Sequence, residues 1–367
     1  MKRPIVLKIG SSSVTTPRGE VDTTVMGRLC EEIAGLRAGG ETVVVVSSGA
    51  IATGWAVLGR EGPPTGEPAQ LQAVSALGQP RLMQCWGQAL GAHGLAAGQV
   101  LLTPTDLMHR QQYLHARGTL SHLVTLGVVP VVNENDAVAD EEIRFGDNDR
   151  LAALVAHLVD ARLLVLLTDA AGLLTADPRR AEAGSLIEEV VEIDHQLEAL
   201  AGGPGSGVGS GGMASKLAAA KIATWSGVRT VIADAARPGV LAGAVAGSRG
   251  VGTVFRPRPR SRRLPARKLW IAFARGSSGT LVVDAGARRA LEEHGRSLLP
   301  AGVLRARGTF LSGDAVEIEG PEGRVFAKGL VQYGSSDASR WLGRRREDLP
   351  DELANEVVHR DDLVLLD

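Results

Sequence analysis

Short, continuously apolar runs alternate with longer Ala-, Leu- and Arg-rich segments over residues 1–255. The runs read PIVLKIG, TVVVVSSGA, QVLLT, GVVPVVNENDAV, ARLLVLLTDAAGLL and VRTVIADA. Because polar residues do not alternate with the apolar ones, these runs predict strands buried on both faces of a mainly parallel sheet. The segments between them predict helices over 23–38, 111–126, 149–159 and 213–226, and two helical segments within 69–92. We therefore predict an α/β fold, a three-layer αβα sandwich with a mainly parallel central sheet, whose ligands bind at the carboxyl ends of the strands.

The pattern changes near Arg256. The segment RPRPRSRRLPARK, residues 256–268, holds seven basic residues and three prolines without apolar periodicity, which predicts a semi-extended linker. The alternative is a basic arm that binds RNA phosphates. Residues 269–367 contain the β-like pieces KLWIAF, GTLVVD, AVEIEG, RVFAKGLVQY and DLVLLD, and one helical piece, GARRALEEHG. We therefore predict a large domain over 1–255, the linker, and a small, separate β-rich domain over 269–367.

Composition narrows the class of protein. A length of 367 residues is consistent with two domains, and a hydrophobic share of 44% permits a sizeable core. The net charge of −1 argues against a protein that binds nucleic acid over its whole surface. Residues 256–367 carry 20 basic and 16 acidic residues, whereas residues 1–255 carry 20 basic and 25 acidic residues. A mild excess of positive charge is therefore confined to residues 256–367.

Cysteine usage and hydropathy indicate the compartment. Cys30 and Cys85 are the only cysteines and lack CxxC spacing, which excludes a disulfide framework and a zinc finger. No apolar run approaches the roughly 18 residues of a membrane-spanning helix. We expect a cytoplasmic protein with no membrane association.

A glycine-rich stretch, GSGVGSGGMASKL, covers residues 205–217. A P-loop is excluded because Ser215 precedes Lys216 and Leu217 follows it. A dinucleotide fingerprint is also excluded, because the preceding residues resemble a helix end and a loop rather than a strand. Either the stretch is a surface loop, or it is a glycine loop before a helix whose first turn carries a lysine, which would bind phosphate.

Lys8 lies inside the first apolar run, where a buried lysine is costly unless it is paired. One interpretation is a lysine that reaches solvent from the strand end. The functional interpretation places it at the carboxyl end of the first strand, beside a Gly-Ser turn that faces phosphate. The segment SSGAIATG, residues 47–54, follows the second strand in the same way, although Ser47 or Ser48 could simply cap a helix.

Two segments rich in carboxylates and amides, NENDAV at 133–138 and FGDND at 145–149, are the most informative. The spacing of an EF-hand calcium loop is absent. Asp147, Asn148 and Asp149 precede a predicted helix, so one of them is expected to cap it. The functional interpretation is a polar cluster that holds a small amino-bearing substrate and orients nearby lysines.

Taken together, LKIGSSSV, VSSGAIATG, NENDAV, FGDND, LLTDAAGLLTADP and GSGGMASKLAAA resemble the amino acid kinase family, in the correct order over residues 2–255. The C-terminal part resembles the PUA domain, a small pseudo-barrel known mostly from RNA-modifying proteins. The resemblance implies ATP-dependent phosphorylation of the γ-carboxylate of L-glutamate, the first step of proline biosynthesis, with feedback inhibition by proline. Members that act on acetylglutamate, aspartate, carbamate or UMP remain alternatives, as does an RNA-binding protein with a vestigial kinase domain.

The resemblance also implies roles for individual residues. It makes Lys8, Lys216 and Asp149 catalytic, with the two lysines on the ATP phosphates and the transferred group and Asp149 orienting them. It gives glutamate binding to Ser48, Asp136, Asn148, Asn133 and Asp147. It gives ATP binding to Lys8, Gly10, Ser11, Thr168, Asp169, Ser210, Gly211, Gly212, Met213, Ala214, Ser215 and Lys216. Ala214 stands where the family commonly has serine.

The chemistry suits these residue types. The γ-carboxylate of glutamate has a pKa near 4.3 and is ionised at neutral pH, so no general base is needed. Phosphoryl transfer needs positioning and positive charge between two anions. The expected cofactors are ATP and Mg²⁺, and we predict no protein metal ligand. Further expected partners are proline as inhibitor, RNA at the PUA-like domain, a second copy of the chain in a homo-oligomer, and glutamyl-phosphate reductase as recipient of the product.

Overall fold

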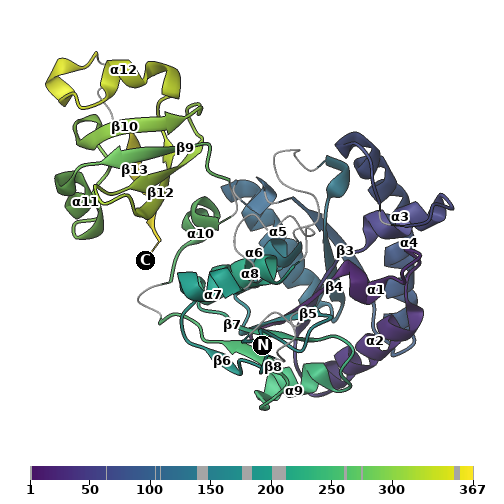
Figure 1. Cartoon of the computed structure of the whole chain (residues 1–367). Helices are drawn as coiled ribbons and strands as arrows, with labels where there is room; N and C mark the ends of the chain where they lie inside the picture. The colour runs from purple at the N-terminus through teal and green to yellow at the C-terminus, as the bar shows by residue number, and fades with distance from the viewer. Residues whose placement is uncertain are drawn as a thin grey trace. The chain divides into compact units, whose positions relative to one another are not determined.

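The chain folds into two compact units, residues 1–263 and 264–367, in a computed structural model (Figure 1). The structure describes residues 2–62, 64–103, 105–107, 109–138, 148–175, 184–200, 212–259, 263–273, 276–350 and 356–366. The division between the units falls inside the segment predicted to be a linker. Each unit has its own sheet and its own buried core.

The first unit is built on an eight-stranded sheet with strand order β3-β4-β2-β1-β5-β7-β8-β6. Its strands are β1 Ile5–Ile9, β2 Val43–Ser47, β3 Ala97–Leu102, β4 Val129–Glu134, β5 Leu163–Thr168, β6 Glu189–Val190, β7 Arg229–Asp234 and β8 Gly252–Phe255. All neighbouring pairs are parallel except β7 with β8. Helices cover both faces of this sheet, so the predicted αβα sandwich is confirmed.

The helices of the first unit follow the predicted pattern closely. They are α1 Ser11–Val14, α2 Thr23–Ala38, α3 Ala50–Val57, α4 Pro68–Gly91, α5 Arg110–Thr125, α6 Asn148–Leu158, α7 His195–Leu200, α8 Met213–Trp225 and α9 Val240–Ala246. Four helices begin and end within one residue of the prediction. The two segments predicted within 69–92 are instead one helix, α4, which continues through Pro80.

The alternation of side chains along β1 determines which way Lys8 points. Ile5, Leu7 and Ile9 pack into the cluster that includes the buried residues of α2, α4 and α9. Side chains of a strand alternate between the two faces of the sheet. Lys8 therefore lies on the opposite face, the one covered by α6 and α8 (Figure 1).

The second unit contains a five-stranded sheet with strand order β10-β9-β11-β12-β13. Its elements are α10 Ala266–Phe273, β9 Gly279–Val283, α11 Ala285–Glu292, β10 Val303–Gly308, β11 Ala315–Glu319, β12 Val325–Val331, α12 Ala338–Trp341 and β13 Val358–Leu365. The pattern analysis was wrong at KLWIAF, which lies in α10 rather than in a strand. Leu269, Trp270 and Ile271 are all buried, and a short run that is apolar all round does not distinguish a buried helix from a strand.

Within the described ranges, no helix is both long enough and apolar enough to cross a membrane.

Candidate functional site

The site lies where four parallel strands end at one edge of the large sheet. Lys8 is the fourth of the five residues of β1, and Ser48 directly follows β2. Asn133 lies near the end of β4, and Thr168 is the last residue of β5. Parallel strands bring their carboxyl ends to the same edge, and this is where ligands bind in open α/β sheets. Sequence positions as far apart as 8 and 168 therefore meet in space.

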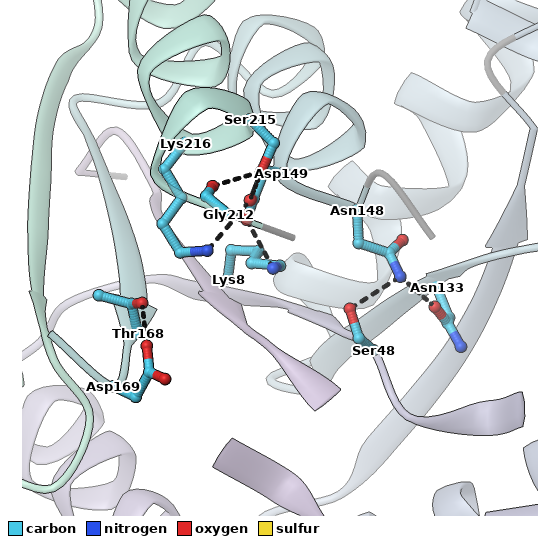
Figure 2. Close-up of polar contacts among 10 residues, drawn as sticks. All are labelled: Lys8, Ser48, Asn133, Asn148, Asp149, Thr168, Asp169, Gly212, Ser215 and Lys216. Carbon is cyan, nitrogen blue, oxygen red and sulfur yellow. Dashed lines mark hydrogen bonds and ion pairs between the residues drawn. The ribbon is translucent and has the colours of Figure 1, made fainter. Parts of the chain in front are cut away.

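A buried carboxylate joins the two predicted lysines (Figure 2). Asp149, in the first turn of α6, lies 2.5 Å through Oδ1 from the Nζ of Lys8 and 3.4 Å through Oδ2 from the Nζ of Lys216. Ser215 donates a hydrogen bond of 2.7 Å from its hydroxyl to Oδ2 of the same carboxylate. The structure thus brings Lys8, Asp149 and Lys216 together from a strand and two helices.

The charges of this cluster stabilise one another. Burial alone raises the pKa of Asp149, but the positive charges of Lys8 and Lys216 and hydrogen bonds from Lys8 and Ser215 outweigh it and lower the pKa. Asp149 is therefore ionised at neutral pH. The charges of these three described residues, two ammonium groups and one carboxylate, sum to one positive charge, and all three residues are buried from water. Such a place attracts an anion strongly.

A second cluster, made of amides and a hydroxyl, lies over β2 and β4 (Figure 2). Asn148 donates from Nδ2 to the hydroxyl of Ser48 at 2.9 Å and to Oδ1 of Asn133 at 3.0 Å. Asn133 donates in turn from Nδ2 to Oε1 of Gln79 on α4, at 2.7 Å. Asn148 thus contacts both Ser48 and Asn133, the two other predicted substrate residues of this cluster.

Asp136 lies directly beyond β4, in a 3-10 turn over Asp136–Val138. Its side chain is buried, and burial raises its pKa from 3.8 to about 6. Burial therefore makes the negative charge of Asp136 costly in the free protein, and a cation placed beside it would stabilise that charge.

Thr168 and Asp169, predicted at the nucleotide, lie at the end of β5, beyond Lys8 and Lys216 as seen from Asn148 (Figure 2). The hydroxyl of Thr168 donates to Oδ1 of Asp169 at 3.0 Å. The two lysines therefore lie between an amide cluster over β2 and β4 and a hydroxyl–carboxylate pair over β5.

Glycines lie at the starts of helices along the same edge of the large sheet. Gly10 directly follows β1 and is the N-cap of the short α1, which begins at Ser11. A Cβ at Gly10 would lie 3.6 Å from the Nζ of Lys8. Gly49 follows Ser48 with φ of +111°, a conformation that favours glycine. Gly212 caps α8, whose first turn holds Met213, Ala214 and Ser215. Of the remaining predicted residues, Asp147, Ser210 and Gly211 lie outside the described residues.

Sequence reasoning missed Gln79. A glutamine in a predicted helix is usually a surface residue, so nothing in its type pointed to the site. The available signal was its neighbours, since Gly78 and Pro80 are the two residue types least suited to a helix interior.

Among the described residues, no group of three or more His, Cys, Asp and Glu side chains is placed to hold a metal ion.

Comparisons with known proteins extend over both units. The profile of the amino acid kinase family matches residues 3–234, and that of the PUA domain matches residues 279–353. The glutamate 5-kinase of Trichlorobacter lovleyi is 46% identical over 99% of this chain and 97% of its own length. The glutamate 5-kinases of Syntrophotalea carbinolica and Nocardia farcinica are 47% and 46% identical, over 98% and 99% of this chain and 96% of their own lengths.

Proposed function

The chain belongs to the amino acid kinase family, and we propose that it transfers the γ-phosphoryl group of ATP to the γ-carboxylate of L-glutamate. The product, L-glutamyl 5-phosphate, is the first intermediate of proline biosynthesis. Relatives named glutamate 5-kinase that match nearly the whole chain support this activity. The structural observation that carries it is the buried Lys8–Asp149–Lys216 cluster beside the amide cluster.

The amide cluster suits the amino-acid end of glutamate. Oδ1 of Asn148 is buried and has no hydrogen-bond partner among the described residues, so it is open to a donor such as an ammonium group. The carboxylate of Asp136 supplies the matching negative charge. The hydroxyl of Ser48 accepts from Asn148 and can donate its own hydrogen to a carboxylate of the substrate. We assign Asp147 to the amide cluster on the family resemblance alone.

The lysines suit the transferred group. In a loose phosphoryl-transfer transition state the charge spreads over the equatorial phosphate oxygens, and catalysis consists mainly of positioning and charge stabilisation. Lys8 and Lys216 supply positive charge to both anions, which otherwise repel each other. Asp149 keeps the two ammonium groups adjacent, and Ser215 helps to orient its carboxylate. The nucleophile is an ionised carboxylate, so no residue has to remove a proton.

ATP fits the opposite side of the cluster. The net positive charge at the lysines suits phosphate oxygens, and the glycine-capped start of α8 presents backbone N–H groups beside Lys216. We assign Thr168 and Asp169 to the nucleotide, together with Gly10 and Ser11 beside Lys8 and the 210–216 segment. Mg²⁺ would be held by the phosphates of ATP rather than by a protein cage, and bound there it neutralises phosphate charge.

The chemical groups that proline shares with glutamate support inhibition by proline. Proline and glutamate both carry an α-amino group and an α-carboxylate, so the Asp136 and Asn148 region can accept either. We propose competitive inhibition, with the KM for glutamate raised by proline and the kcat unchanged.

Other proposals concern location and partners. The PUA match and the positive excess of residues 256–367 support RNA as a partner of the second unit. Self-association, transfer of the product to glutamyl-phosphate reductase and a cytoplasmic location stay predictions drawn from the family resemblance and the sequence.

The proposed activity is tested with the purified protein, ATP and Mg²⁺, and hydroxylamine to trap an acyl phosphate as a hydroxamate. Glutamate is compared with acetylglutamate, aspartate, carbamate and UMP. We expect ADP release together with hydroxamate for glutamate alone. Turnover of another substrate with none of glutamate would refute the proposed specificity, and no turnover with any substrate would favour the RNA-binding alternative.

A further inference from the structure

A hydrogen bond from the backbone determines which end of the Asn133 amide group is the oxygen. The backbone N–H of Glu134 can only donate, and it donates to Oδ1 of Asn133 at 2.8 Å. The opposite end of the amide is therefore Nδ2, a donor, and it faces Gln79. Gln79 must present its acceptor, Oε1, to this group.

The orientation of Asn133 then determines that of Asn148. Oδ1 of Asn133 is an acceptor, so Asn148 must turn Nδ2 toward it, as the contact of 3.0 Å requires. The same Nδ2 donates to the hydroxyl of Ser48. If Asn148 were reversed, two carbonyl oxygens would face each other inside the protein. Oδ1 of Asn148 is thus directed away from this network, buried and unpartnered within the described part of the chain.

Gln79 lies between Gly78 and Pro80, two residues that destabilise the interior of a helix. Gly78 lies so close to α3 that a Cβ there would be 1.9 Å from the backbone oxygen of Ala50. Pro80 lies inside α4 and has no N–H, so it cannot complete the hydrogen bond to the carbonyl four residues earlier. Both neighbours weaken the helix, and Gln79 lies half-buried between them, directly beside the close contact of Gly78 with α3.

We propose that Gln79 is a positioning residue that sets the direction of the hydrogen bonds in the amide cluster of Ser48, Asn133 and Asn148. Its Oε1 holds Asn133, and Asn133 holds Asn148, in the orientation that presents a buried acceptor to the α-ammonium group of the substrate. The inference rests on the proposed function only for the identity of that ammonium-bearing substrate. The directions of the hydrogen bonds among Gln79, Asn133 and Asn148 are set in the ligand-free protein and do not depend on the substrate.

Two substitutions of Gln79 distinguish the loss of its hydrogen-bond acceptor from a change in side-chain packing. Gln79→Met keeps the length of the side chain but removes the acceptor, whereas Gln79→Glu keeps an acceptor oxygen. Gln84→Met is the matched control, since Gln84 lies on the same helix, is exposed, and accepts a hydrogen bond from Arg81 at the surface. The readouts are the KM for glutamate and the inhibition constant of glutarate, which lacks the α-amino group.

We expect Gln79→Met to raise the KM for glutamate about tenfold, the effect of leaving one buried hydrogen bond unmade. The inhibition constant of glutarate should change less than about threefold, because glutarate carries no ammonium group for Asn148. Gln79→Glu and Gln84→Met should remain near the wild type. The inference is overturned if glutamate and glutarate weaken equally in Gln79→Met, if Gln79→Glu behaves like Gln79→Met, or if neither variant differs from the wild type.

A second measurement does not depend on turnover. The chain contains only four asparagines, at 133, 135, 148 and 355, so ¹⁵N-asparagine labelling yields four side-chain amide pairs. Hydrogen exchange at Nδ2 of Asn133 should be slow in the wild type and in Gln79→Glu, and at least about tenfold faster in Gln79→Met. Equal rates would refute the role of Gln79 even if glutamate is not the substrate. An inactive wild type with the expected exchange pattern would refute the proposed function alone.

Discussion

At the scale of single residues, Lys216 and Lys221 form a natural pair for comparison, because both lie on α8. Lys216 is buried against Asp149, whereas Lys221 forms a partly exposed ion pair with Glu198 at 2.7 Å. In the proposed mechanism, only Lys216 of these two lysines lies where charge develops during phosphoryl transfer. Its contribution should therefore appear in the kcat, and that of Lys221 should not.

We predict that Lys216→Ala lowers the kcat by roughly 10²- to 10³-fold, the usual loss when a charge-stabilising donor is removed. The fold should persist, since Asp149 still pairs with Lys8. Steady-state kinetics and circular dichroism check both statements, with Lys221→Ala as the control that keeps its kcat. A near-normal kcat in a folded Lys216→Ala variant would remove this lysine from the proposed mechanism.

Asp136 should make substrate binding depend on pH. Its pKa of about 6 in the free protein means that the carboxyl is half neutral at that pH, and neutral Asp136 no longer attracts an ammonium group. The KM for glutamate should rise as the pH falls below 6, by up to about tenfold per pH unit, while the kcat changes little. Asp136→Asn should have a high KM that does not vary between pH 5 and 8. A wild-type KM that is flat over this range would contradict the assignment.

The same pKa affects stability in the opposite direction. The folded protein holds the Asp136 proton more tightly than the unfolded chain, whose value is near 3.8. The contribution of this residue to the free energy of unfolding therefore increases as the pH falls from above 6 toward 4. Binding and stability thus respond oppositely to acid at this residue.

The sequence identified those site residues whose type is unusual for the segment in which they lie. Lys8 stands in an apolar strand and FGDND in front of a helix, so both attracted attention. The partnership of Lys8 with Asp149 joins positions far apart in the chain, and no local pattern contains it. Glutamine itself is an ordinary residue type in a helix, so only the neighbours Gly78 and Pro80 distinguish Gln79 in the sequence, and its contact with Asn133 is visible only in the fold.

At the scale of elements, the close contact between α3 and α4 fixes the part of α4 that carries Gln79. Gly54 and Gly78 let the two helix backbones approach, and a Cβ at either position would lie 1.9 Å from a carbonyl oxygen of the other helix. Glycine normally weakens a helix, so these two are retained for the close approach rather than for the helices themselves.

We predict that Gly78→Ala destabilises the protein by about 1–3 kcal/mol, because the helices must move apart to admit the methyl group. Gly87→Ala in the same helix is the control. A Cβ at Gly87 meets nothing within 4 Å, so alanine should stabilise by about 0.5–1 kcal/mol. Urea unfolding of both variants measures these changes. Equal effects at the two positions would show that helix propensity, and not the α3–α4 contact, decides the outcome.

Element prediction worked where periodicity and length agreed. The helices α2, α5, α6 and α8 have polar flanks and enough length for the pattern to identify them. The pattern predicted a strand in place of α10, because Leu269, Trp270, Ile271 and Ala272 form a buried apolar run too short to show a helical period. Packing against β12 and β13 determines its structure, and that information is not local.

At the scale of the whole molecule, the division into two units separates the proposed chemistry from the C-terminal part. Every site residue that the structure describes lies within residues 1–263. The large sheet and its core are also complete within this range. A domain with its own core can in principle fold alone. The cut at Arg263 would also preserve the end of the first unit, where Arg258 lies over the ring of Trp225 and its backbone N–H donates to Thr224.

We therefore predict that a chain ending at Arg263 folds cooperatively and phosphorylates glutamate with a kcat within about threefold of the full chain. A chain ending at Phe255 is the informative comparison, because it removes the Arg258 contacts and should be less stable by about 1–2 kcal/mol. Thermal unfolding and steady-state kinetics of the two truncated chains provide the measurement. If the chain ending at Arg263 is folded but inactive, the second unit must contribute to catalysis, and the proposed site within the first unit would be incomplete.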